Sequence, residues 1–127
     1  MRATISITMP CVLVVDDDDA LRDAVVEAIT DAGYTVEQAE NGREALTKMR
    51  ASRPCLVLLD LMMPMMDGWE VVSEMDADPK LASVPVCIVS AQTGIAPPRN
   101  VGVLKKPASL AGLLRAVETH CGKPSLG

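Results

Sequence analysis

Short aliphatic runs alternate along this chain with stretches in which apolar residues recur at every third or fourth position. Continuous apolar runs cover 11–15, 56–59 and 86–89, and runs of this length are typical of strands buried on both faces. We expect weaker strands at 35–39 and 101–104. Helical spacing of apolar residues predicts amphipathic helices at 20–32, 42–50, 69–78 and 110–121.

The order of these elements predicts the fold class. Strands and helices alternate along the chain, with one loop in place of a helix between the fourth and fifth strands. Such alternation implies an α/β fold with a parallel sheet, right-handed crossovers and helices on both faces. The loop is expected because residues 92–100 contain Gly94, Pro97 and Pro98, which rule out an ordinary helix across most of this segment.

The chain is long enough for one domain with a sizeable core. It has 127 residues, and 49% of them are hydrophobic. We expect residues 1–9 to form a short N-terminal extension, 10–121 the folded domain and 122–127 a C-terminal tail. The sequence shows neither an internal repeat nor a linker to a second domain.

The net charge of −5 narrows the classes of partner. A broad nucleic-acid surface is basic, so we expect no direct DNA binding, and the acidic balance gives no support for attraction to anionic lipid. No apolar run approaches the ~18 residues that a membrane span needs, and no signal peptide is recognisable. The sequence therefore predicts a cytoplasmic protein that does not bind membranes.

The four cysteines are far apart in the sequence, at positions 11, 55, 87 and 121. There is no CxxC pair, and three of the cysteines lie in or beside apolar runs. We therefore interpret them as small buried residues in a reducing compartment, and we expect neither a zinc site nor a disulfide.

Acidic residues directly follow two of the buried runs. Asp60 ends the run at 56–59, and the acidic residues 16–19 follow the run at 11–15. The carboxyl ends of parallel strands lie along one edge, where open α/β sheets bind ligands, so we expect the two groups of carboxylates to lie close together. The Asp67–Gly68 pair requires the chain to turn soon after Asp60, which leaves this acid on a short constrained loop.

Five separated segments, in this order, resemble the receiver domain of two-component response regulators. They are VLVVDDDD, GYTVEQAENGREAL, VLLDLMMPMMDGWE, IVSA and LKKP, and the ordered set is more specific than any one of them. The resemblance covers about 10–121. It implies a flavodoxin-like, doubly wound sheet of five parallel strands in the order 2-1-3-4-5, here with a shortened or missing fourth helix.

The resemblance assigns roles to residues at the strand ends. Asp60 would be the phosphoacceptor, because it matches the acid that ends the family's third strand. The side chains of Asp16, Asp17 and Asp60 would hold Mg²⁺ or Mn²⁺, with Asp17 as the direct ligand of the acidic pair. The backbone carbonyl of Met62 would complete the protein's ligands. Such ions prefer these hard oxygen donors, and the ion would offset the repulsion between carboxylates and phosphate oxygens.

Two further positions match the family. Ser90 corresponds to the hydroxyl residue at the end of the fourth strand, and Lys106 corresponds to the lysine that precedes a proline. Ser90 would donate a hydrogen bond to the phosphoryl group, and Lys106 would neutralise one of its oxygens. Many members have an aromatic residue three positions before this lysine, whereas this chain has Val103. The family's output mechanism therefore does not transfer directly.

The resemblance also implies partners. A sensor histidine kinase or a histidine phosphotransfer protein would supply the phosphoryl group, and an unknown downstream protein would read the changed conformation. We expect a stand-alone receiver that is not an enzyme beyond its own phosphorylation and dephosphorylation. Homodimer formation and a place in a phosphorelay stay open.

Two alternatives remain at this point. A haloacid-dehalogenase-like phosphatase would use Asp16 as nucleophile and Asp18 as acid, but it leaves Asp60 unexplained and lacks a later acidic pair after Lys106. A receiver-like binding module without phosphorylation would not need the full set of acids together with Ser90 and Lys106.

Overall fold

A parallel sheet forms the middle layer of the protein. The structure is a computed structural model and describes residues 11–91 and 102–124. The five strands are β1 (Cys11–Val15), β2 (Thr35–Ala39), β3 (Leu56–Asp60), β4 (Val86–Ser90) and β5 (Gly102–Lys105). Each neighbouring pair is parallel, and the order across the sheet is β2-β1-β3-β4-β5. The predicted flavodoxin-like order is confirmed.

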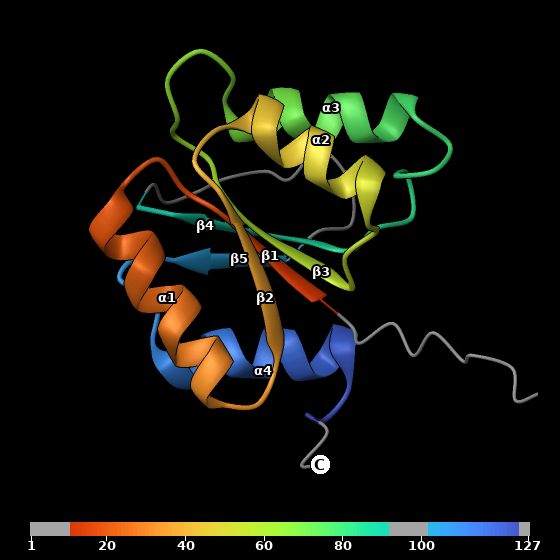
Figure 1. Ribbon diagram of the computed structural model, residues 1–127. Helices are drawn as coiled ribbons and strands as arrows, with labels where there is room; N and C mark the ends of the chain where they lie inside the picture. Colours follow the sequence, from red (N-terminus) through yellow and green to blue (C-terminus); the bar gives the residue numbers. More distant parts are fainter. Residues whose placement is uncertain (1–10, 92–101, 125–127) are drawn as a thin grey trace, which may run out of the picture.

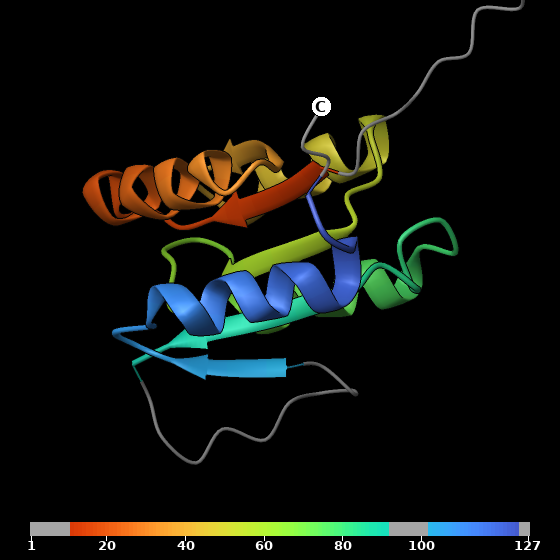
Figure 2. The ribbon, with the colours of Figure 1, turned by 90° about the horizontal axis from the view of Figure 1, so that it is seen from below.

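Helices cover both faces of the sheet, as Figures 1 and 2 show. The helices of the described residues are α1 (Asp19–Asp31), α2 (Gly42–Ala51), α3 (Gly68–Ala77) and α4 (Leu110–Cys121). The helices α2 and α3 lie on one face, and α1 and α4 lie on the other (Figure 1). No helix among the described residues is both long enough and apolar enough to span a bilayer.

Alternating side chains of the central strands build two separate cores. In β1, Leu13 and Val15 belong to the core under α2 and α3, whereas Val12 and Val14 belong to the core under α1 and α4. Neighbouring residues of a strand point to opposite faces, so a run of apolar residues is needed to fill both cores. All five residues of β3 are buried, including its last residue, Asp60.

Polar side chains cap each described helix at its N-terminus. The caps of α1, α2, α3 and α4 are Asp18, Asn41, Asp67 and Ser109, and each side chain accepts a hydrogen bond from a backbone N–H in the first turn. These residue types supply the acceptor that the first N–H groups of a helix lack. The observed elements begin and end within two residues of the predicted ones.

The predicted loop between β4 and β5 lies almost wholly in residues 92–101, outside the described residues. The predicted N-terminal extension also lies outside them, as do residues 125–127 of the tail. The domain boundaries at 10 and 121 stay predictions.

The interpretation of the cysteines was wrong for two of them. A disulfide joins Cys55, directly before β3, to Cys121, the last residue of α4. The two residues are 66 positions apart in sequence, and their Cα atoms lie 5.3 Å apart. A helix that crosses back over a parallel sheet ends beside the amino ends of the strands, so the fold brings together two cysteines that sequence spacing separates.

The other two cysteines, Cys11 and Cys87, are free thiols. Cys87 lies in the core under α1 and α4, and burial raises the pKa of its thiol to about 11. Burial also raises the pKa of Cys11, helped by the negative charge of Glu37. Both are therefore thiols rather than thiolates at neutral pH, as expected of small residues used for packing.

Candidate functional site

The carboxylates of two neighbouring strands meet at the carboxyl edge of the sheet. Val15 pairs with Leu59, so Asp16 and Asp60 occupy equivalent places one residue further on. The hydrogen bond from the Asp16 N–H to the carbonyl of Ala39 (3.1 Å) keeps β1 extended up to this point. Parallel register therefore places the two acids side by side, as the sequence predicted.

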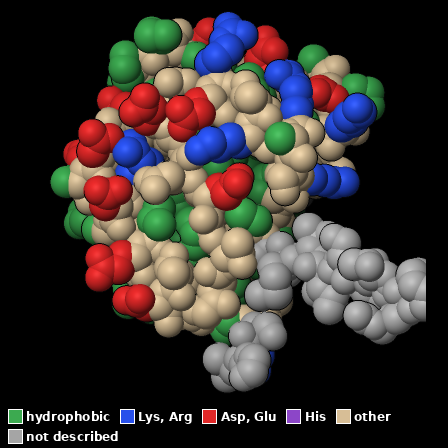
Figure 3. Space-filling model, in the orientation of Figure 1, with side chains coloured by type: hydrophobic (Ala, Val, Ile, Leu, Met, Phe, Trp, Pro, Cys, Tyr) green, Lys and Arg blue, Asp and Glu red, His purple; other side chains and the backbone are tan. Residues whose placement is uncertain are grey.

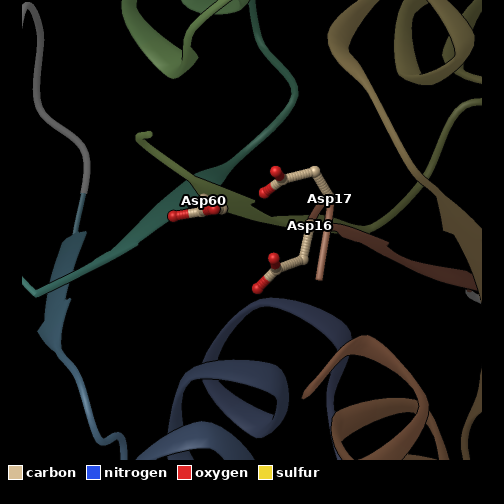
Figure 4. Close-up of side chains that lie close together, drawn as sticks. All are labelled: Asp16, Asp17 and Asp60. Atoms are coloured by element: carbon tan, nitrogen blue, oxygen red, sulfur yellow. The ribbon is translucent and has the colours of Figure 1, made fainter. Parts of the chain in front are cut away.

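Asp17 completes a group of three carboxylates. One oxygen from each of Asp16, Asp17 and Asp60 can be chosen so that all three lie within 4.8 Å of one another. Figure 4 shows the three carboxylates turned to the same side of the sheet edge. Asp16 and Asp60 are each only 6% exposed, whereas Asp17 is exposed. The arrangement offers closely spaced oxygen ligands with one side open to solvent, and this fits a hard divalent cation such as Mg²⁺.

Lys106 contacts two of these carboxylates at the same edge of the sheet. It follows β5, and its Nζ lies 3.3 Å from Oδ2 of Asp16 and 3.3 Å from Oδ1 of Asp60. The Lys106 N–H donates to the carbonyl of Ser90 at 2.7 Å, which fixes the start of this loop against the end of β4. The lysine and the two buried acids thus form one ion-pair cluster.

Ser90 ends β4 at the same edge. Its strand neighbour Val89 pairs with Asp60, and Ser90 itself pairs with Lys105. Ser90 is buried, with 1% of the residue exposed. The fold therefore brings Ser90 to the edge at which Asp60 and Lys106 meet, while its predicted contact with a phosphoryl group stays a prediction.

Burial and like charge make Asp60 a weaker acid than usual. Burial raises the pKa of Asp60, the negative charge of Asp16 raises it further, and the ion pair with Lys106 offsets part of the rise, so that the pKa is about 6. For Lys106, burial alone would lower the pKa, but the charges of Asp60 and Asp16 outweigh it and raise the pKa. The cluster therefore still lacks positive charge.

The surface around the cluster is acidic as well. Figure 3 shows acidic side chains gathered on the side of the molecule where α1 lies. The run Asp17, Asp18 and Asp19 is exposed there. A divalent cation would reduce the repulsion within the cluster and toward an approaching phosphate.

The loop after Asp60 is held in place from α3. The N–H of Gly68 donates to the carbonyl of Leu61 at 2.9 Å. A Cβ atom at Gly68 would lie only 3.0 Å from the carbonyl oxygen of Asp60 and from the Cα of Leu61. Asp67 and Glu70 form a reciprocal capping box at the start of α3. Glycine at this position lets the helix approach the backbone that carries Asp60.

Met62 lies at the exposed start of the same loop. The N–H of Met62 donates to Oδ1 of Asp60 at 3.3 Å, and Met62 is 59% exposed. The backbone N–H of Met62 therefore adjoins the carboxylate cluster. Its carbonyl as a metal ligand stays a prediction.

Comparison with known families decides the relationship. The family model of the response regulator receiver domain matches residues 12–118, which include the whole site.

The chain belongs to the response regulator receiver family.

Curated relatives of this receiver include longer regulators. It is 36% identical over 110 residues to the response regulator MprA of Mycolicibacterium vanbaalenii, covering 81% of this chain and 46% of that protein. It is 37% identical over 83 residues to RpaA of Synechocystis, named as a DNA-binding dual master transcriptional regulator, covering 65% of this chain and 34% of that protein. The chain spans less than half the length of these relatives.

Solved structures match over nearly the whole receiver. The chemotaxis protein CheY4 of Vibrio cholerae has a TM-score of 0.79 and 31% identity, covering 89% of this chain and 99% of that one. A CheY-like receiver domain protein of Methanospirillum hungatei has a TM-score of 0.78 and 27% identity, covering 89% of this chain and 94% of that one. Both favour the receiver over the phosphatase alternative.

Sequence reasoning missed one residue that positions the receiver's acidic loop. The guanidinium of Arg22 donates to the carbonyl of Asp16 at 2.7 Å, to Asp19 at 2.7 Å and to Gln38 at 3.0 Å. Arg22 therefore fastens the end of β1 to both α1 and β2. The spacing of Asp19 and Arg22, three residues apart at a helix start, was the available signal for the ion pair, but nothing in the sequence indicated the contact with Asp16.

A largely apolar cavity of about 350 Å³ adjoins the receiver's carboxylate cluster. Leu21 and Val25 of α1 and Leu113 of α4 line it, and its charged lining residues are Asp16, Asp60 and Lys106. Apolar walls keep the local dielectric constant low and therefore strengthen the charge interactions within the cluster.

Proposed function

We propose that Asp60 accepts a phosphoryl group from a sensor histidine kinase or a histidine phosphotransfer protein. An oxygen of the Asp60 carboxylate forms a bond to phosphorus as the phosphorus–nitrogen bond of the donor phosphohistidine breaks, and the imidazole leaves. The observation that carries this proposal is the placement of Asp60 beside Asp16 and Asp17, with the ammonium of Lys106 at 3.3 Å. The family is a signalling phosphoacceptor domain, which supports the assignment.

The three carboxylates together with the Met62 carbonyl are proposed to hold Mg²⁺ or Mn²⁺. The spacing of the carboxylate oxygens and the absence of soft donors among the three side chains fit such an ion. When bound, the ion supplies positive charge that permits a phosphoryl group to approach a cluster of acids. Asp17 is the exposed member and is proposed as the direct ligand from the acidic pair.

Lys106 and Ser90 are proposed to bind the phosphoryl oxygens. Lys106 now bridges Asp16 and Asp60, so phosphorylation of Asp60 gives its ammonium a new anionic partner at almost the same place. Ser90 is buried, and a shift of its hydroxyl toward the phosphoryl group therefore displaces neighbouring atoms. This displacement is the proposed start of the conformational change.

The change in shape is proposed to reach a separate downstream protein in the cytoplasm. The acidic balance of this chain supports a protein partner rather than DNA. RpaA, one of its longer relatives, is named as a DNA-binding regulator. Two copies of the chain could also form a homodimer, and phosphorylation would then change the equilibrium between monomer and dimer in one direction or the other.

Intact mass after incubation with Mg²⁺ and acetyl phosphate tests the proposal. We expect a single phosphoryl adduct in the parent, none in Asp60→Asn, and none in the parent when EDTA removes the metal. Asp31→Asn is a matched control, because this exposed residue ends α1; it should be phosphorylated like the parent.

Two results would count against the proposal. An adduct that persists in Asp60→Asn would place the phosphoacceptor elsewhere. The absence of an adduct in every variant, with acetyl phosphate and with a phosphorylated histidine phosphotransfer protein alike, would favour the binding-module alternative.

A further inference from the structure

The disulfide lies at the end of the sheet opposite the carboxylate cluster, and it joins the two elements that lead to that cluster. Cys55 directly precedes β3, whose last residue is Asp60. Cys121 ends α4, whose N-cap, Ser109, stands three residues after Lys106. One covalent bond therefore joins the start of β3, which ends in the proposed phosphoacceptor Asp60, to the end of α4, which begins shortly after Lys106.

The two sulfurs are anchored unequally. Cys55 is held by the sheet, because its N–H donates to the carbonyl of Cys11 at 2.9 Å. Cys121 follows three exposed residues, 118–120, and the last side chain of α4 that is fully buried is Val117. Beyond Val117, the helix end is held by the disulfide, by partial packing of Cys121 against the core, and by hydrogen bonds at Gly122. The Tyr34 hydroxyl donates to the carbonyl of Gly122 (2.8 Å), and the N–H of Gly122 donates to the carbonyl of Glu118 (2.9 Å).

The pair is also placed for exchange with an external thiol. Cys55 and Cys121 are both partly exposed, and they lie at a loop and at a helix end rather than in the middle of a core. The free Cys87 is buried, with a pKa of about 11. Cys87 therefore does not act as an internal thiolate that attacks the disulfide, and exchange is left to an external thiol.

We propose that Cys55 and Cys121 form a reversible redox site that regulates phosphorylation of Asp60 by setting the position of α4. This inference rests on the proposed function. The proposed location is the cytoplasm, where thiols are kept reduced and disulfides are usually transient or redox-sensing. The chemical class of the co-reactant is a dithiol reductant and its oxidised form.

The redox step is a thiol–disulfide exchange. A thiolate of the reductant attacks one of the two sulfurs, forming a mixed disulfide, and the other cysteine leaves as a thiolate and takes up a proton. The second thiol of the reductant then displaces the remaining cysteine. In total, the Cys55–Cys121 bond gains two electrons and two protons, and the dithiol becomes a disulfide. Oxidised dithiol reverses the reaction.

We expect reduction to make the position of α4, and of the Lys106 loop that precedes it, less firmly fixed. Without the bond, the last turn of α4 loses its covalent link to the segment before β3 and keeps the partial packing of Cys121 and the hydrogen bonds at Gly122. Movement of the helix along its axis then reaches Ser109 and the neighbouring Lys106, and it disturbs the ion pairs with Asp16 and Asp60. Couplings through such packed elements are worth roughly 2- to 30-fold in an equilibrium or rate.

The test compares the oxidised and reduced forms of the whole chain. Maleimide labelling in denaturant counts the thiols: two are expected without reductant and four after dithiothreitol, from the four cysteines of the sequence. Phosphorylation by acetyl phosphate with Mg²⁺ is then followed by intact mass in both forms. We expect the reduced form to react more slowly, by roughly 2- to 30-fold, and re-oxidation to restore the rate.

Variants separate this site from other effects of the reductant. The double variant Cys55→Ser, Cys121→Ser should react at the slow rate under both conditions. Cys11→Ser, which keeps the disulfide, should respond to dithiothreitol like the parent. Should the double variant fail to fold, native reduction of the parent gives the same comparison without substitution.

Each remaining outcome decides between the two proposals. Four thiols in the protein at every ratio of oxidised to reduced dithiothreitol would overturn the redox site, and so would equal phosphorylation rates in the two forms. No adduct in either form would count against the proposed function. In that case, the amide NMR signals of Lys106, Ala108 and Ser109 decide the redox inference alone, which is overturned if reduction leaves them unchanged.

Discussion

The two ends of the same sheet are built on opposite principles. At the carboxyl edge, Asp16 and Asp60 are buried next to each other and share one ammonium, that of Lys106. At the amino edge, a covalent bond between Cys55 and Cys121 closes the structure without any buried charge. Reactive groups require the first arrangement, which lowers stability in the absence of ligand. The second arrangement stabilises the fold at a distance from the carboxylate cluster.

The largest expected effect comes from breaking the amino edge. The disulfide closes a loop of 66 residues, for which the chain-entropy relation gives about 4 kcal/mol of stabilisation. We expect Cys121→Ser to lose most of this free energy of unfolding, measured by urea denaturation. The parent in dithiothreitol should lose as much, whereas Cys11→Ser without reductant should stay close to the oxidised parent. A loss below about 1 kcal/mol would show that the amino edge is held by packing instead.

The next effect concerns the charge at Asp60. Its pKa is raised from 3.8 to about 6 in the folded protein, so between these values the folded state binds more protons than the unfolded state. Stability from this group is present at low pH and is lost as pH rises from about 4 to 6, by up to roughly 3 kcal/mol. Urea denaturation across this pH range, without divalent ions, measures it.

The variant Asp60→Asn sharpens this prediction. Its amide does not titrate, so we expect the variant to lack this part of the pH dependence and to be more stable than the parent at pH 7.5. Asp31→Asn should keep the full dependence of the parent. If the free energy of unfolding of Asp60→Asn changed with pH between 4 and 6 as steeply as that of the parent, another group would be responsible for the pH dependence.

A smaller effect on stability is expected from removing the positive charge of Lys106. Lys106→Met removes the charge that lowers the pKa of Asp60 and leaves two buried carboxylates without a counter-ion. We expect a loss of about 1–2 kcal/mol at neutral pH, in line with the strength of charge pairs at this spacing, and a further rise in the pKa of Asp60. Urea denaturation and carboxyl NMR titration measure the two changes. The exposed neighbour gives the matched control Lys105→Met, for which little change is expected.

The smallest effect is expected in the loop after Asp60. Met65 has a φ of 70°, which disfavours residues with a side chain, and it is 91% exposed, so its side chain contributes little packing. Met65→Gly should therefore stabilise the protein by roughly 0.5–1 kcal/mol, while Met65→Ala keeps the strain. Thermal unfolding of the two variants provides the comparison. Equal melting temperatures would mean that the loop relaxes to another conformation.

The carboxyl edge was largely predictable from the sequence, and the amino edge was not. Continuous aliphatic runs that end in Asp16 and Asp60 indicate neighbouring buried strands, and parallel strands necessarily bring such ends to one edge. The pairing of Cys55 with Cys121 depends on where a helix 66 residues later returns across the sheet. No local pattern records that position, and the general rarity of disulfides in reducing compartments pointed the other way.

The side-chain contacts within the site could be predicted only in part from the sequence. The motifs named Lys106 but not its shared ion pairs with Asp16 and Asp60. The hydrogen bond from Arg22 to the Asp16 carbonyl was not predictable, because it requires knowledge of the chain's path after β1. The roles of Ser90 and of the Met62 carbonyl stay predictions.

The order of the strands has a further consequence for how the protein behaves in crowded solution. Among the described residues, β2 and β5 each pair with a single strand, and each carries exposed polar or charged side chains. Glu37 and Gln38 are exposed on β2, and Lys105 is exposed on β5, whose four residues make it the shortest of the described strands. Charged, short edge strands are poor templates for the addition of a foreign strand. The aggregation-prone aliphatic segments, β1, β3 and β4, are enclosed between them.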